Sequence, residues 1–141
     1  MKTKNKPLFA AFSTQKGGVG KTTFTVLVAS YLHYLKGYEV AVIDCDFPQW
    51  SISGLRKQEA EQIEKNEYYQ NKASLFFSQF QRMTYPILCT TPEDAIAKTK
   101  EFLREEEVMY DIVLFDLPGS INNRSVVETF FAMDYIFVPI S

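Results

Sequence analysis

Five short apolar runs, separated by segments with helical periodicity, constrain the fold of this chain more than any other feature. The runs are Leu8 to Phe12, Val40 to Ile43, Pro86 to Cys89, Ile112 to Phe115 and Tyr135 to Val138. Runs such as "VAVI" and "IVLF" are apolar throughout, which is typical of strands covered on both faces. Because helices separate the strands, the sequence predicts an α/β fold with a mainly parallel sheet.

The segments between these runs predict four helical regions, over about 21–36, 52–82, from 92 onward and 123–133. In the first, apolar side chains recur at helical spacing and Gly37 supplies a stop signal. The second region is long and its internal boundaries are the least defined by the sequence, with a break near Asn71 as an alternative to one continuous helix. Thr91 can cap the third helix and Pro92 suits its first position, whereas the acidic residues 105–107 favour fraying at its end.

Size and charge exclude several classes of protein. The chain has 141 residues, 46% of them hydrophobic, with a formal net charge of -2. We therefore expect a single domain over residues 1–141 without a general attraction to nucleic acid or anionic membranes. No apolar run approaches the ~18 residues of a membrane span, and Cys45 and Cys89 match no metal-ligand spacing. These features predict a reducing, cytoplasmic setting. Because the chain stops directly after its fifth run, we also expect a truncated fold with an uncovered edge.

A glycine-rich segment, Lys16 to Thr23, lies between the first predicted strand and the first predicted helix. Glycines allow the backbone to approach an anion, and the N–H groups of a helix N-terminus then point at it. Lys21 can neutralise phosphate oxygens, and the Thr22 hydroxyl can bind a phosphate-bound Mg²⁺. The predicted nucleotide-binding residues are Gly17, Gly18, Val19, Gly20, Lys21, Thr22 and Thr23. The alternative is a glycine-rich turn without a ligand.

Three aspartates follow predicted strands at their carboxyl ends. Asp44 and Asp46 follow the second run, and Asp116 follows the fourth. Ligands of open parallel sheets bind outside these strand ends, so we expect the carboxylates to converge on the glycine-rich segment. Carboxylates placed there can hold Mg²⁺ through waters or orient an attacking water. The alternative for Asp116 is an ordinary strand-end acid or a helix cap.

The position of Lys16 before the glycines, with Gln15 in place of the usual first glycine, resembles the deviant Walker A signature of the ParA/MinD superfamily. The resemblance implies an ATP-sandwich homodimer in which Lys16 acts in trans on the nucleotide of the other subunit. A solvated surface lysine is the alternative.

Two further segments resemble motifs of the same superfamily. Residues 44–49 resemble the switch I motif Asp-x-Asp-Pro-Gln, with Phe47 inserted before Pro48. By this resemblance Asp46 positions the hydrolytic water, Asp44 supports Mg²⁺ and Asp116 corresponds to the Walker B aspartate. The segment Leu117 to Ser120 resembles switch II, which senses the γ-phosphate. The set of predicted catalytic residues is therefore Lys16, Lys21 and Asp46, and the predicted metal site comprises Thr22, Asp44 and Asp116.

The segments "STQKGGVGKTT", "VIDCDFPQ", "FDLPG" and "AMDYIFVPIS" together resemble the ParA-like proteins of conjugative transposons, the TraA group. The resemblance implies a three-layer P-loop NTPase fold and a slow, Mg²⁺-dependent ATPase that switches dimerisation during partition or transfer of a mobile element. It also implies binding to non-specific DNA and to a partner protein through a C-terminal part that lies beyond this sequence. The alternatives are a nucleotide-binding regulatory module without hydrolysis and a metabolic P-loop enzyme.

Other residues carry weaker expectations. We expect His33, the only histidine, to be solvated on the first helix and to have no role. Cys45 is expected to be a small buried filler. An aromatic zone is expected to serve mainly as core, with a partner surface as the alternative; it comprises Tyr68, Tyr69, Phe76, Phe77, Phe80 and Tyr85.

Overall fold

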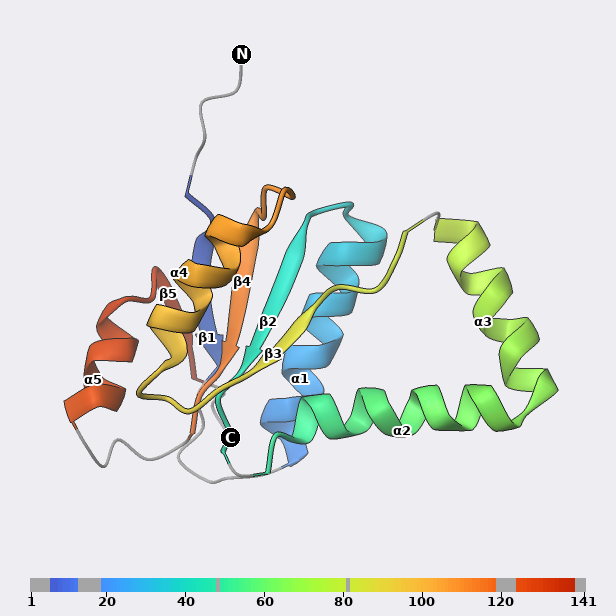
Figure 1. The fold of residues 1–141 in the computed structure, drawn as a ribbon, viewed down its shortest axis with the longest axis horizontal. Helices are drawn as coiled ribbons and strands as arrows, with labels where there is room; N and C mark the ends of the chain where they lie inside the picture. Colours follow the sequence, from blue (N-terminus) through green and yellow to red (C-terminus); the bar gives the residue numbers. More distant parts are fainter. Residues whose placement is uncertain (1–5, 13–18, 48, 81, 119–123, 139–141) are drawn as a thin grey trace, which may run out of the picture.

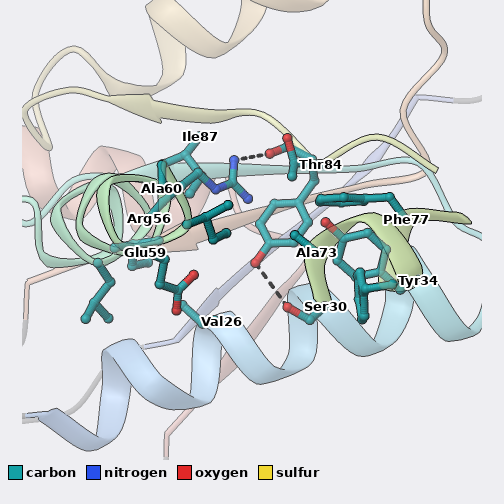
Figure 2. A pocket seen from close by; sticks show the side chains of 15 residues that line it. Val26, Ser30, Tyr34, Arg56, Glu59, Ala60, Ala73, Phe77, Thr84 and Ile87 are labelled. Atoms are coloured by element: carbon teal, nitrogen blue, oxygen red, sulfur yellow. Dashed lines mark hydrogen bonds between the residues drawn. The ribbon is translucent and has the colours of Figure 1, made fainter. Parts of the chain in front are cut away.

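A computed structural model describes residues 6–12, 19–47, 49–80, 82–118 and 124–138. Its single sheet contains the five strands β1 (Leu8–Phe12), β2 (Val40–Asp44), β3 (Ile87–Cys89), β4 (Ile112–Asp116) and β5 (Tyr135–Phe137). The strands lie in the order β3-β2-β4-β1-β5, and every pairing is parallel (Figure 1). This confirms the predicted parallel α/β fold of the P-loop NTPase type, and each strand begins and ends within one residue of its predicted position.

The helices are α1 (Val19–Ser30), which continues into a π-helical turn at Tyr31–Leu35, α2 (Ser51–Lys65), α3 (Glu67–Phe80), α4 (Ala95–Glu105) and α5 (Arg124–Phe131). The long region after β2 is divided at Asn66, whose backbone is extended, so the region does contain a break, but before Asn71. The helix predicted from residue 92 begins instead at Ala95. There, Thr91 accepts a hydrogen bond from the backbone N–H of Asp94 across a turn that precedes the helix.

Side chains of alternate residues in the central strands pack into two separate cores. Ala10, Phe12, Val40, Val42 and Leu114 face one side of the sheet, together with Ala29 of α1 and Ile52 of α2. Ala11, Ala41, Ile43, Val113 and Phe115 face the other side, together with residues of α4 and α5. The sheet therefore has a layer of helices on each face, because successive side chains of a strand point in opposite directions.

The connection that follows β1 leads to α1 on one face, whereas the connection that follows β4 leads to α5 on the other face. β1 and β4 are adjacent, with Phe12 paired to Asp116. Asp116 is in turn paired to Asp44 at the end of β2. Ligands of open parallel sheets bind at such a switch point, outside the carboxyl ends of the strands. The fold thus brings Asp44 and Asp116 to that edge.

α2 and α3 form an arm that extends away from the sheet (Figure 1). α3 has no buried residue, and Tyr68 on it is 58% exposed. The expectation that the aromatic zone is mainly core was therefore wrong for α3, although Tyr85 beside β3 is buried. Within the ranges that the structure describes, no helix is long and apolar enough to cross a membrane.

Candidate functional site

The described part of the glycine-rich segment forms the first turn of α1. Val19 and Gly20 open the helix, Lys21 and Thr22 follow as buried residues, and Thr23 is exposed. The first N–H groups of a helix have no partner within it, and they favour an anion at this end. Lys16, Gly17 and Gly18 lie outside the described residues, so their predicted roles stay predictions.

Lys21 and Asp116 form a buried ion pair that joins α1 to the end of β4. Lys21 Nζ lies 3.1 Å from Asp116 Oδ1, and the two side chains are 4% and 0% exposed. The ammonium group also donates a hydrogen bond to the carbonyl oxygen of Leu117, the residue after β4. Lys21 therefore already has an anionic partner at the point where it was predicted to meet phosphate.

The Asp116 carboxyl group lies in a site that disfavours its charge. Burial raises its pKa to about 6, and the nearby Lys21 ammonium group opposes that rise. Within the described residues, Asp116 Oδ2 has no hydrogen-bond partner. A buried carboxylate oxygen without a partner is costly in an apo protein, and a bound cation or ordered water would satisfy it.

Asp44 holds the beginning of α2. Its Oδ2 accepts hydrogen bonds from the backbone N–H groups of Ile52 at 3.2 Å and Ser53 at 3.3 Å, while its Oδ1 accepts one from Asp46 at 3.3 Å. Burial raises the pKa of Asp44, and these three hydrogen bonds oppose that rise. Asp44 therefore acts as a cap for a helix that begins seven residues later, a role that sequence analysis missed.

Asp46 follows β2 and is partly exposed at the same edge of the sheet. Among the described residues, no group of three or more histidine, cysteine, aspartate or glutamate side chains is placed to hold a metal ion. Mg²⁺ in nucleotide sites keeps several waters and uses one or two carboxylates together with phosphate oxygens, so it needs no cage made of protein alone. The buried Asp116, whose Oδ2 has no partner within the described ranges, and Thr22, which follows Lys21 in α1, are of the kind that fits such an ion.

Trp50 is a further residue of this edge that sequence analysis did not identify. Its backbone adopts φ 42° and ψ 59°, and no other described non-glycine residue has a positive φ. Its indole Nε1 donates a hydrogen bond of 3.1 Å to the carbonyl oxygen of Thr90, which follows β3. No sequence pattern indicates a left-handed tryptophan, because the conformation depends on contacts between distant segments.

Two of the weaker expectations can also be compared with the structure. The expectation of a solvated His33 was wrong, because it is 4% exposed and its Nε2 lies 2.8 Å from the carbonyl oxygen of Met83. The expectation for Cys45 is confirmed, since this side chain is fully buried. Burial also raises the pKa of its thiol, which disfavours the reactive thiolate form.

Comparison with protein families finds one that covers most of the chain. The CobQ/CobB/MinD/ParA nucleotide binding domain matches residues 10–133, which include the last three residues of β1, all of α1, and Asp44, Asp46 and Asp116. A curated relative from Borreliella burgdorferi (strain ATCC 35210 / DSM 4680 / CIP 102532 / B31), an uncharacterized protein, is 54% identical over 43 residues. That stretch is 30% of this chain and 17% of the relative.

Two similar solved structures come from Borrelia burgdorferi. A putative plasmid partition protein of strain B31 bound to AMPPNP has a TM-score of 0.59 and 19% identity, covering 96% of this chain and 63% of its own. A plasmid partition protein has a TM-score of 0.57 and 20% identity, covering 96% of this chain and 66% of its own. The chain thus spans less than two thirds of each of these proteins, and at this identity the likeness concerns the fold.

Proposed function

This chain belongs to the CobQ/CobB/MinD/ParA nucleotide-binding domain family, and we propose that it binds ATP together with Mg²⁺ at the switch point between β1 and β4. The observation that carries the proposal is the buried Lys21–Asp116 pair at the N-terminus of α1. It places one cation where the helix favours an anion, beside a carboxylate that has an oxygen without a partner among the described residues.

Each residue of the site has a distinct part in this proposal. Lys21 exchanges part of its contact with Asp116 and Leu117 for phosphate oxygens, while the N–H groups of the first turn of α1 hold the phosphates. Thr22, Asp44 and Asp116 would hold the nucleotide-bound Mg²⁺, directly or through waters. When bound, Mg²⁺ supplies neutralisation of phosphate charge. Asp46, which is partly exposed, orients the attacking water.

The predicted switch function rests on the family and on the sequence motifs. We propose that ATP closes a homodimer in which Lys16 acts in trans, and that slow hydrolysis opens it again. The similarity to two plasmid partition proteins supports a role in partition or transfer of a mobile element. Contacts with non-specific DNA and with a partner protein are expected to involve parts of a longer protein, since this chain spans less than two thirds of either neighbour.

One observation favours a second candidate, a nucleotide-binding regulatory module without hydrolysis. Both oxygens of Asp44 already accept hydrogen bonds from backbone N–H groups, two of them in α2. The adjoining segment also carries Phe47, which packs against Trp50 at a ring-centroid distance of 5.3 Å. If this arrangement persists with nucleotide bound, the Asp44 carboxylate stays engaged by these N–H groups and does not hold the metal.

Two measurements on one set of variants separate these candidates. Saturating ATP with Mg²⁺ should raise the melting temperature of wild type, because a ligand at 100 times its Kd stabilises the folded state by about 2.7 kcal/mol. Release of inorganic phosphate by wild type above the level of Asp46→Asn supports the ATPase. Lys98→Ala, a change at an exposed position of α4, serves as the matched control. Stabilisation without phosphate release in wild type would favour the regulatory module.

A further inference from the structure

Trp50 has an unfavourable backbone conformation beside the candidate site. A bulky residue in the left-handed region is strained, and such residues persist only where their surroundings hold them. Here the indole ring is held by its hydrogen bond to Thr90 and by the edge-to-face contact with Phe47. Thr90 is itself joined to the site, because its backbone N–H donates a 3.0 Å hydrogen bond to the carbonyl oxygen of Asp44.

Three hydrogen bonds, together with the backbone from Trp50 to Ile52, form a closed ring that begins and ends at Asp44. The N–H of Asp46 donates to Asp44 Oδ1, and the N–H of Trp50 donates to the carbonyl oxygen of Asp46 at 2.8 Å. Two residues after Trp50, the N–H of Ile52 donates to Asp44 Oδ2. The left-handed turn at Trp50 lets both parts of the chain face the same carboxylate. The placement of Asp46 and the direction of α2 therefore depend on this turn.

We propose that Trp50 is a positioning residue of the nucleotide site, acting through Asp44 and Asp46 on the part of the site that would hold Mg²⁺. This inference rests on the proposed function. The described residues that would meet phosphate, Lys21 and Thr22, belong to α1, and no hydrogen bond or ring contact joins them to Trp50. Trp50 therefore affects binding of the metal-bound nucleotide and not binding of the nucleotide alone.

The indole ring also provides a direct readout, because Trp50 is the only tryptophan in the sequence. Engagement of Asp44 or Asp46 by nucleotide-bound Mg²⁺ changes the ring of hydrogen bonds and hence the surroundings of the indole. ATP with Mg²⁺ should therefore change the tryptophan fluorescence of wild type, whereas ATP with a chelator should leave it unchanged. Tyr68→Leu, at an exposed position of α3, should respond as wild type does.

Calorimetric titration of the same samples distinguishes failure of the inference from failure of the proposed function. Calorimetric binding of ATP with Mg²⁺ without a fluorescence change would overturn the inference and leave the proposed function intact. Absence of binding by folded wild type would overturn the proposed function, and the inference would fall with it.

The variant Trp50→Phe tests the positioning role through the ratio of its ATP affinity in Mg²⁺ to its ATP affinity in chelator. Partial unfolding does not alter this ratio. Trp50→Phe retains an aromatic ring but cannot donate to Thr90. We expect its ATP affinity in chelator to stay within about twofold of wild type, while its affinity in Mg²⁺ falls about tenfold, which is about 1.4 kcal/mol. A smaller folded fraction would lower both affinities equally. An unchanged ratio of the two affinities would overturn the positioning role.

Discussion

Lys21 Nζ lies 3.1 Å from Asp116 Oδ1, and neither side chain is more than 4% exposed. The pair joins the first turn of α1 to the end of β4, next to the point where the chain would bind nucleotide. Breaking a buried pair from one side leaves an uncompensated charge, whereas removing both partners does not. The pair therefore contributes both to the stability of the domain and to the charge of its candidate site.

Lys21→Ala should lower the free energy of unfolding by about 3–5 kcal/mol, because it leaves the buried Asp116 carboxylate without its cation. The double variant Lys21→Ala/Asp116→Asn should recover a large part of that loss. Urea denaturation measures both. Arg124→Ala breaks the exposed ion pair with Glu128 and should change stability by no more than about 1 kcal/mol. A Lys21→Ala effect as small as that of Arg124→Ala would contradict the account.

The stability of wild type relative to Asp116→Asn should fall as the pH rises from about 4 to about 6. The pKa of Asp116 is raised from 3.8 to about 6 in the folded protein, so the folded state retains a proton that the unfolded state releases within this window. The cost of charging the buried group is complete above the window, at about 3 kcal/mol, and absent below it. Urea denaturation at a series of pH values should show this decline. A difference between the two proteins that stays constant or rises would contradict it.

Arg82→Ala should destabilise the junction between the arm and the sheet by about 1–3 kcal/mol. The Arg82 guanidinium group donates to the carbonyl oxygens of Gly37 and Tyr38, pairs with Glu39 at 2.9 Å and lies 3.3 Å from His33 Nδ1. Its loss removes a partner of the buried His33 ring and of the partly buried Glu39, whereas the carbonyl oxygens of Gly37 and Tyr38 are exposed to water. Urea denaturation measures the effect, with Arg104→Ala on the exposed side of α4 as the control. Equal effects of the two variants would show that this network contributes nothing.

Lys16→Ala should abolish ATP-dependent dimerisation while ATP binding is retained, if Lys16 acts in trans as the sequence motif predicts. Sedimentation with and without ATP and Mg²⁺ measures the dimer, and calorimetry measures binding. Lys6→Ala, at an exposed position before β1, is the matched control for loss of one positive charge near this end of the chain. ATP-dependent dimerisation that is unchanged in Lys16→Ala would contradict the trans role.

The sheet and the meeting of Asp44 and Asp116 at one of its edges could be predicted because both depend on local sequence. Runs such as Val40 to Ile43 are long enough and apolar enough to identify buried strands, and a parallel sheet brings their carboxyl ends, with Asp44 and Asp116, to one edge. The sequence alone therefore predicts that carboxylate side chains lie at this edge of the sheet.

Other features could not be predicted because they depend on contacts between distant segments. Burial of His33 requires Arg82 and Met83, about 50 positions away. The capping of α2 by Asp44 and the left-handed turn at Trp50 likewise arise from tertiary contacts. Aromatic residues are typical of a protein core, and the sequence of α3 therefore predicted burial. The arm extends from the sheet and leaves Tyr68 exposed, so this prediction from composition was wrong.

Calorimetric titration of ATP with Mg²⁺ tests the central claim most directly, using wild type, Lys21→Ala/Asp116→Asn and Lys98→Ala at equal concentration. The double variant removes the two charges of the site without leaving one of them buried and unpaired, and its thermal unfolding shows whether it is folded. We predict binding by wild type and Lys98→Ala, and none by the folded double variant. Binding by the double variant with the affinity of wild type would place the nucleotide elsewhere and contradict the account.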